Sequence, residues 1–207
     1  VQVRGLFRNV FSAGGPFPLF SREMLLFSIP ASAAGLLSKL NSWIDRIFVG
    51  HFLDADEVGI YVAASQLSNL LALVTVVFTV ILGPMAAHHF ARKEKEQLIQ
   101  LYQLSTKWTI YLALVPSLIL IFFAETSLSV SFGTRFSGSS LPLVVLVLAH
   151  FLLILPGSAG VLLVMTQKQN QWLLLCTMTV LVNSIANYLL IPHYGLLGAA
   201  TATGLSM

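Results

Sequence analysis

The chain has 207 residues, of which 57% are hydrophobic and only 9% are charged. Soluble domains carry about 25% charged residues, so this composition, with a mean hydropathy of +0.86, excludes an ordinary water-soluble fold. It predicts an all-α, polytopic membrane helix bundle, and the length allows about six spans of roughly 20 residues each. The net charge of +3 is explained by Lys and Arg in cytoplasmic loops, so we expect no nucleic acid partner.

The apolar runs predict spans, in chain order, over about 24–52, 58–83, 108–124, 141–166 and 172–191, with a truncated sixth after a turn at 192–195. Breaks are predicted at Gly83-Pro84 and at Pro156-Gly157. Between the spans we expect an acidic turn, a basic connection, a polar Gly/Ser-rich loop and a short polar turn, over 54–57, 92–107, 125–140 and 167–171.

Lys and Arg are distributed unequally between the two sides of this topology. Eight lie on the side of the N-terminus: Arg4, Arg8, Arg22, Arg92, Lys93, Lys95, Lys107 and Lys168. The loops of the other side hold only Arg135. Because cytoplasmic loops are enriched in Lys and Arg, we predict a cytoplasmic N-terminus in a cytoplasmic (plasma) membrane protein.

The first predicted span carries charges inside an apolar run, where they are costly. On a helical wheel its polar residues share one wedge of roughly 160°: Ser38, Lys39, Asn41, Ser42, Asp45 and Arg46. The wedge predicts a helix that borders a polar cavity, with Lys39 past the bilayer midplane and Asp45 and Arg46 near the outer interface. The alternative is that Arg46 snorkels outward and Asp45 is merely interfacial.

Other polar residues in the spans leave two interpretations open. Asn183 and Asn187 are four residues apart in the fifth span, and Gln66 and Asn69 lie in the second. All four can line a cavity or hydrogen-bond a neighbouring helix. The lone His150 is interpreted as a packing residue. Neither the His88-His89 pair nor the single cysteine, Cys176, predicts a metal site or a disulfide.

The sequence contains no recognisable enzyme motif. It has no HExxH, no Gly-rich phosphate loop and no Ser/His/Asp grouping in a plausible context. The short loops leave little room for a catalytic domain. We therefore predict a non-enzymatic protein without a cofactor.

Several segments, in order, resemble one transporter family. They are SWIDRIFVGHF, EVGIYVAASQLSNLL, ILGPMAAHHFARKEKEQLIQLYQLSTKW, FAETSLSVSFGTRFSGSS and LLIPHYGLLGAATATGLS. Over about residues 20–207 they resemble the second half of oligosaccharide and polysaccharide flippases, including O-antigen-type flippases. These belong to the multidrug/oligosaccharidyl-lipid/polysaccharide exporter superfamily.

The resemblance implies two six-helix lobes around a central cavity and transport of lipid-linked oligosaccharides by alternating access. Residues 23–207 would form the C-terminal lobe, and residues 1–22 a cytoplasmic connecting segment. The first residue is not Met and the last apolar run has no closing loop, so we expect a piece of a longer protein that lacks its N-terminal lobe. The resemblance also assigns Lys39 and Arg46 to contacts with the phosphates of an anionic lipid-linked glycan.

Three other functions fit the sequence less well than a flippase does. A cation-coupled multidrug antiporter of the same superfamily would favour an acidic, aromatic-lined cavity, whereas this span carries two cations and one anion. A membrane-embedded glycosyl- or acyltransferase would need acidic or histidine groups clustered at the interface and larger loops. A structural scaffold would not explain the charged wedge.

Overall fold

The computed structural model describes residues 22–206, and every element in that range is a helix. The α-helices are α2 (Arg22–Phe52), α3 (Ala55–Ser68), α4 (Leu70–Ala91), α5 (Lys95–Phe122), α6 (Ala124–Phe132), α7 (Ser140–Ile154), α8 (Ala159–Met165) and α9 (Gln169–Ser206). A 3₁₀-helix, η1, covers Thr134–Ser139. The predicted connecting segment 1–22 lies almost entirely outside the described residues.

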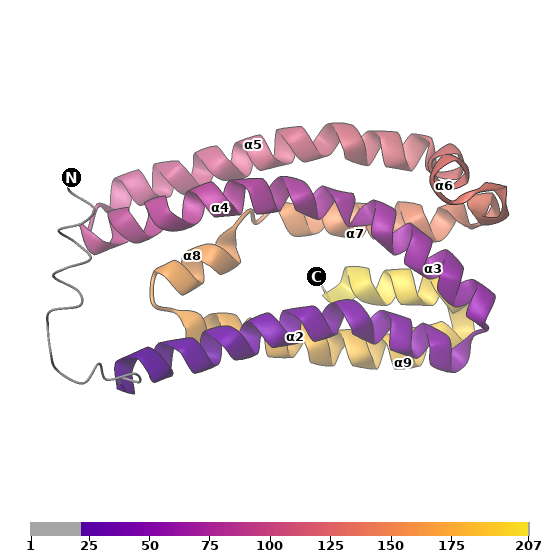
Figure 1. The fold of residues 1–207 in the computed structure, drawn as a ribbon, viewed down its shortest axis with the longest axis horizontal. Helices are drawn as coiled ribbons and strands as arrows, with labels where there is room; N and C mark the ends of the chain where they lie inside the picture. The colour runs from indigo at the N-terminus through magenta and orange to yellow at the C-terminus, as the bar shows by residue number, and fades with distance from the viewer. Residues whose placement is uncertain (1–21, 207) are drawn as a thin grey trace, which may run out of the picture.

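The long helices form an elongated bundle in which successive long helices run in opposite directions, whereas α2 and the long part of α9 lie side by side and run the same way (Figure 1). One end holds the start of α2, the α4–α5 turn and the α8–α9 turn. The other end holds the α2–α3 turn, α6, η1 and the fold-back of α9. α2 packs mainly against α9, α4 against α5, and α7 against both α5 and α9. The prediction that successive turns lie at alternating ends of the bundle is therefore confirmed.

The second predicted span has its break in a different place. The helix is interrupted at Asn69, between α3 and α4, and continues through Gly83 and Pro84 to Ala91. The predicted break at Gly83-Pro84 is wrong. A proline removes one backbone hydrogen-bond donor. A membrane helix tolerates this loss because the other backbone groups keep their hydrogen bonds only when the chain stays helical.

The predicted basic connection is much shorter than expected. Only residues 92–94 separate α4 from α5, so Lys95 begins a helix and Lys107 lies about 18 Å inside it. The Lys107 ammonium lies over the Tyr111 ring, 5.9 Å from its centroid. Helix α5 also passes through Pro116 without a break. The polar loop predicted over 125–140 is wrong as well, because α6 and η1 fill it.

The predicted break at Pro156-Gly157 is confirmed, because α7 ends at Ile154 and α8 begins at Ala159. Gly157 has a φ of +62°, which disfavours residues with a Cβ. The Tyr102 hydroxyl on α5 donates a hydrogen bond to the Pro156 carbonyl. This bond attaches the break to the neighbouring helix.

The last helical element is two helices joined by a sharp reversal. Gly195 adopts φ 57° and ψ −134° inside α9, and the chain then folds back beside the preceding helix (Figure 1). At Gly198 a Cβ would overlap the backbone carbonyl of Leu190. The turn predicted over 192–195 is confirmed, and a glycine at 198 is required for this close approach.

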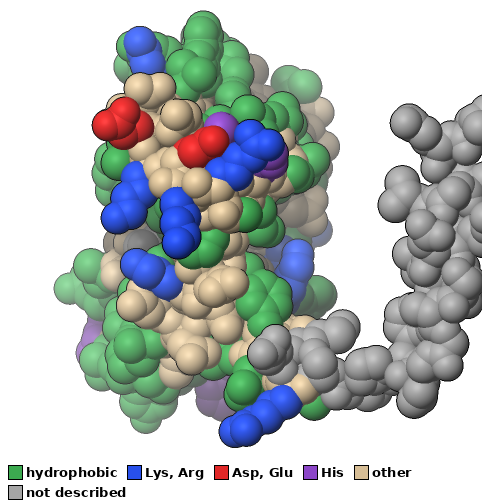
Figure 2. All heavy atoms as spheres, turned by 90° about the vertical axis from the view of Figure 1, so that its left-hand side faces the viewer, with side chains coloured by type: hydrophobic (Ala, Val, Ile, Leu, Met, Phe, Trp, Pro, Cys, Tyr) green, Lys and Arg blue, Asp and Glu red, His purple; other side chains and the backbone are tan. Residues whose placement is uncertain are grey.

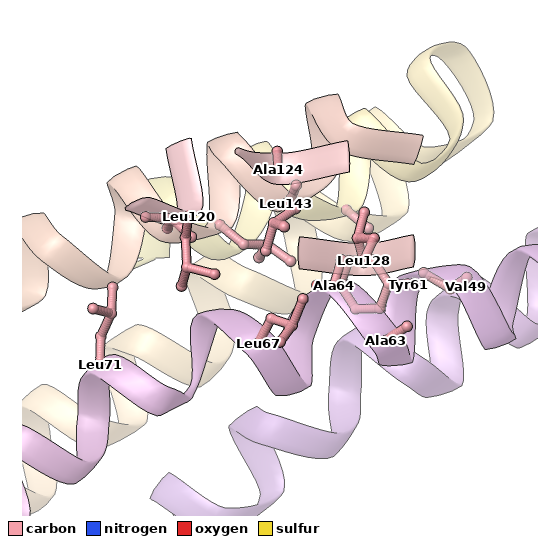
Figure 3. Packing of buried hydrophobic residues seen from close by; sticks show 14 of the residues in the cluster. Val49, Tyr61, Ala63, Ala64, Leu67, Leu71, Leu120, Ala124, Leu128 and Leu143 are labelled. Carbon is pink, nitrogen blue, oxygen red and sulfur yellow. The ribbon is translucent and has the colours of Figure 1, made fainter. Parts of the chain in front are cut away.

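The apolar core lies where α3, α6 and α7 meet α2, α5 and the folded-back part of α9. Figure 3 shows Tyr61, Ala64 and Leu67 of α3 facing Leu128 of α6 and Leu143 of α7. Outside the core, large apolar side chains cover the surface; Val80 is 68% exposed and Phe122 is 76% exposed. In a bilayer such a surface meets lipid rather than water.

Four helical stretches in the described range meet the length and composition of a membrane span: Ala55–Ala91, Lys95–Phe122, Ser140–Met165 and Gln169–Ser206. Helix α2 has 31 residues, which is long enough for a span, and it carries Lys39, Asp45 and Arg46. With α2 and with α9 counted as two helices, the architecture is the predicted bundle of about six spans.

Candidate functional site: a buried carboxylate between α2 and α9

The most unusual feature of the bundle is the buried carboxylate of Asp45, which is 6% exposed. It lies on α2, about 10 Å before the end of that helix at Phe52. The side-chain amides of Asn183 and Asn187 on α9 each donate to Asp45 Oδ1 over 2.8 Å. A carboxylate inside a membrane protein needs such donors because water does not reach it.

The two asparagines use all the protons of their amide nitrogens. Asn183 Nδ2 also donates to Asn41 Oδ1 on α2, over 3.1 Å. Asn187 Nδ2 also donates to Asn183 Oδ1, over 3.1 Å. Both asparagine side chains are fully buried. Of the two interpretations left open for this pair, the interhelical hydrogen bond is the one found, and its main acceptor is charged.

Two further residues of this cluster were not predicted. Thr203, in the folded-back part of α9, donates to Asp45 Oδ2 over 2.9 Å. The Tyr61 hydroxyl on α3 lies 3.2 Å from Thr203 Oγ1. Asp45 is the one feature of the sequence that indicates such partners, because a buried carboxylate requires several hydrogen-bond donors from other helices. Their positions in the chain, 142 residues apart, give no indication of contact.

Asn69 and His150 form a second interhelical contact near the cluster. His150 Nε2 lies 3.0 Å from Asn69 Oδ1, and His150 Nδ1 lies 2.9 Å from the Leu146 carbonyl. His150 is 9% exposed, and both of its ring nitrogens lie within hydrogen-bond distance of these oxygens. Asn69 sits at the α3–α4 break, where its side chain joins that break to α7.

A polar pocket of about 60 Å³ opens beside Asp45. It is lined by residues of four helices: Asn41, Ser42, Asp45, Arg46, Tyr61, Ser65, Asn69, Leu146, His150 and Thr203. The structure therefore brings together four of the predicted site residues here: Asn41, Asp45, Arg46 and Asn69. Asn183 and Asn187 lie behind it, bonded to Asp45. Gln66 and Lys39 are exposed and are not among its lining residues.

The polar wedge of α2 divides into two faces. Asn41 and Asp45 point toward α9, whereas Lys39 and Arg46 lie roughly 100–120° round the helix from Asp45. Lys39 is exposed and Arg46 is half-buried. The Arg46 guanidinium lies over the Trp43 ring, 5.1 Å from its centroid. The second face thus carries two cations, two turns apart: Lys39 is exposed, and Arg46 borders the Asp45 pocket.

The end of the bundle that holds the α4–α5 turn is basic (Figure 2). Its turns contribute Arg92, Lys93 and Lys168. Within this end His89 Nδ1 lies 2.7 Å from the Glu94 carboxylate. That hydrogen bond and the nearby Arg92 hold the pKa of Glu94 below its ordinary value. At the other end Arg135 pairs with Asp56 over 2.7 Å.

No group of three or more His, Cys, Asp or Glu side chains that could hold a metal ion occurs within residues 22–206. The pocket offers one carboxylate together with the Arg46 guanidinium, the His150 imidazole and amide and hydroxyl groups. Such a set does not suit the divalent metals that require several anionic ligands.

Two curated proteins show what this chain is similar to. A probable low-salt glycan biosynthesis flippase (Agl15) of Haloferax volcanii is 24% identical, over 87% of this chain and 38% of its own length. A capsular polysaccharide biosynthesis protein (CapF) of Staphylococcus aureus is also 24% identical, over 89% of this chain and 47% of its own length. The chain thus spans less than half the length of these relatives.

Two solved transporter structures share the fold. One is a transporter of the MOP superfamily from Pyrococcus furiosus, and the other is a multidrug resistance MATE family transporter of the same superfamily in an outward-facing conformation. Both give a TM-score of 0.67 at 19% identity, over 87% of this chain. The matches cover 40% and 41% of those chains, respectively.

The sequence profile of the family described as "Polysaccharide biosynthesis protein" matches residues 18–141, which is more than half of the chain. The match includes α2 with its polar wedge and runs to the start of α7. Taken with the helical bundle, it places this multi-pass membrane protein in the polysaccharide biosynthesis protein family.

Proposed function

We propose that this chain is one lobe of a flippase that moves lipid-linked oligosaccharides or polysaccharide repeat units across the cytoplasmic membrane. Residues 23–207 would form the C-terminal lobe, and a second lobe of the same protein would complete the cavity. The cargo is an anionic glycan on a lipid carrier. Transport would proceed by alternating access, in which one lobe rocks against the other around the cargo site.

The observation that carries this proposal is the cationic face of α2, with Lys39 exposed and Arg46 at the edge of the Asp45 pocket. Lys39 and Arg46 lie two turns apart on the same flank of the helix, and neither side chain makes an ion pair with a described residue. Cations in a membrane helix are costly unless they face a polar path or an anionic ligand. This flank is where a second lobe and a phosphate-bearing cargo would lie.

The orientation of the lobe is proposed from its charges. The end with the α4–α5 and α8–α9 turns carries most of the Lys and Arg (Figure 2). Since cytoplasmic loops collect these residues, this end would face the cytoplasm, with the start of α2. A phosphate-bearing headgroup would then approach the lobe at its basic end.

The test is surface-glycan export in cells that depend on the full-length protein. The variant Lys39→Gln/Arg46→Gln removes both charges while keeping the length of the side chains close to the original. We expect export to fall at least tenfold, because a phosphate loses two charge-assisted contacts worth about 1.5–3 kcal/mol each. Expression and membrane insertion, measured by immunoblot, should stay normal.

The matched control is Lys107→Gln, which removes a cation from inside α5 on a different helix. Its export should equal that of the wild type. Wild-type export by the double variant would show that the α2 cations do not handle the cargo, and the proposed site would be withdrawn.

The alternative is a cation-coupled multidrug antiporter of the same superfamily, and its fold is shared by the MATE transporter structure. The two functions are separated by substrate. An antiporter would lower the accumulation of cationic dyes in cells and leave surface glycan unchanged when deleted. The flippase proposal expects the opposite pair of results.

A further inference from the structure

A second pocket, of about 680 Å³, lies at the basic end of the bundle, away from the cluster around Asp45. Its lining residues fall between 89 and 98 and between 162 and 168. They belong to the end of α4, the α4–α5 turn, the start of α5, the end of α8 and the α8–α9 turn. The volume is in the range of about 300–1,000 Å³ that is usual for ligand pockets.

The pocket carries positive charge that the chain does not neutralise. Lys93, Lys95 and Lys168 line it, all three are exposed, and none makes an ion pair with a residue in the range 22–206. Glu94 is the only carboxylate among the described lining residues. It already has a partner, because His89 Nδ1 lies 2.7 Å from it. The pocket is therefore complementary to an anion.

Two of these lysines occupy positions that a helix disfavours. Lys95 is the first residue of α5, and Lys168 directly precedes α9. The N-terminal end of a helix carries a partial positive charge, so a cation there is destabilising and an anion is stabilising. An anion between the two ammonium groups offsets this repulsion.

The inner wall of the pocket is apolar. Leu98, Leu162 and Leu163 are half-buried there, and Phe90 is 38% exposed. Leu98 lies about 4.5 Å further along α5 than Lys95, on the side of the bundle's middle (Figure 1). The pocket thus has a cationic rim at the end of the bundle and an apolar wall further in. A phospholipid in a bilayer has the same order, with its phosphate at the surface and its acyl chains inside.

We propose that this pocket is a binding site for an anionic phospholipid of the leaflet at this end of the lobe. The headgroup phosphate lies between Lys93, Lys95 and Lys168. One acyl chain runs along Leu98 and Leu163. Basic pockets between membrane helices bind anionic lipid headgroups, and each Lys near the membrane surface adds to the attraction. A free phosphate would use only the rim, whereas a phospholipid also covers the apolar wall.

A lipid in this position connects two parts of the lobe that the chain joins only through other segments. Helix α8 follows the Pro156-Gly157 break, and the lipid attaches its end to the α4–α5 turn. The anionic lipid therefore holds α8 at a fixed distance from the α4–α5 pair. This role concerns the lobe itself and does not depend on the cargo.

The test uses the full-length protein purified in detergent, without cargo. Thermal unfolding is measured against phosphatidylglycerol in mixed micelles, against phosphatidylcholine at the same total lipid, and against inorganic phosphate. We expect a saturable rise in the unfolding temperature with phosphatidylglycerol and no comparable rise with the other two, because a ligand that binds the folded state stabilises it. The response should weaken at high salt.

The variant Lys95→Gln/Lys168→Gln removes two charges of the rim from exposed positions. The phosphatidylglycerol concentration for half-maximal stabilisation should rise at least about tenfold. The matched control is Lys107→Gln/Arg135→Gln, which removes the same charge from residues outside the pocket. Its half-maximal concentration should stay within about twofold of the wild-type value.

A measurement on the wild-type protein keeps the test decisive if the rim variant does not fold. Phosphatidylglycerol with a photoreactive acyl chain should label peptides that contain residues 90–98 and 162–168. Equal stabilisation by phosphatidylcholine, full stabilisation by inorganic phosphate, an unchanged response in the rim variant, or labelling only elsewhere would each overturn the proposal.

The lipid site and the proposed cargo site are tested separately. The variant Lys39→Gln/Arg46→Gln should keep the wild-type phosphatidylglycerol response. If that variant lost the response while the rim variant kept it, the anionic lipid would bind at α2, and the pocket would be rejected as its site. A failure of glycan export to respond to the α2 charges, with an intact lipid response, would contradict only the cargo assignment.

Discussion

Removal of the Asn183 side chain tests the buried network directly. Asn183→Ala deletes the donors to Asp45 and Asn41 and the acceptor used by Asn187. A hydrogen bond to a charged group contributes about 1.5–3 kcal/mol, and interhelical bonds between neutral groups in membranes average about 0.6 kcal/mol. The bond between Asn187 and Asn183 lies within α9, so the two bonds to α2 give a cost of about 2–3.5 kcal/mol for separating α2 from α9.

Hydrogen exchange of the full-length protein in detergent measures this cost locally. A change of 1.4 kcal/mol is tenfold in an equilibrium, so the amides of α9 around position 183 should exchange at least about thirty times faster in Asn183→Ala. The amides of α5, which does not contact this network, should keep their wild-type exchange rates.

Ser184→Ala is the matched control at the next position. The Ser184 hydroxyl donates only to the Val180 carbonyl of its own helix, over 2.8 Å, so its removal should change exchange by less than about threefold. If Asn183→Ala exchanged no faster than Ser184→Ala, the buried amide–carboxylate network would not hold the two helices together, and the reasoning about this site would fail.

Two further predictions concern other parts of the bundle. Gly198→Ala should destabilise the lobe by about 1–3 kcal/mol, because the new methyl group would meet the Leu190 carbonyl; Gly59→Ala, in open space, is the control, and equal unfolding temperatures would refute the close approach. The lowered pKa of Glu94 means that its ionised form stabilises the folded state. That contribution is complete above the ordinary carboxyl pKa of about 4.3 and is lost as the pH falls through the lower folded value. The difference in unfolding temperature between wild type and Glu94→Gln should therefore be constant from pH 7 to 5 and disappear toward pH 3, and a difference independent of pH would contradict the His89 contact.

The approximate number of spans and the side of each turn could be predicted from the sequence because they depend on local properties. Apolar runs of span length and the Pro156-Gly157 break are visible in the sequence. The break at Asn69 is not, because it coincides with a contact to His150, 81 residues away. Gly83-Pro84 indicated a break, but the helix continues through this pair because backbone groups in a membrane have no other hydrogen-bond partners.

The candidate site was predictable in its residues but not in its geometry. The wheel grouped Lys39 and Asp45 on one face, and the wedge does contain both. It could not show that the wedge divides, with Asp45 turned to α9 and Lys39 outward, because that depends on which helix packs against α2. The partners at 183, 187 and 203 are more than 130 residues away in sequence, and only the tertiary fold brings them to Asp45.

The shortness of the α4–α5 turn determines how this lobe deforms. Three residues join helices of 22 and 28 residues, so neither helix slides along the other, and the pair tilts as one rigid hairpin. The α7–α8 break, in contrast, has a glycine at positive φ. The α4–α5 hairpin is hydrogen-bonded to both sides of this glycine, from Tyr102 to the Pro156 carbonyl and between Thr79 and Ser158. We therefore expect a bend at Pro156-Gly157 to be transmitted to the hairpin.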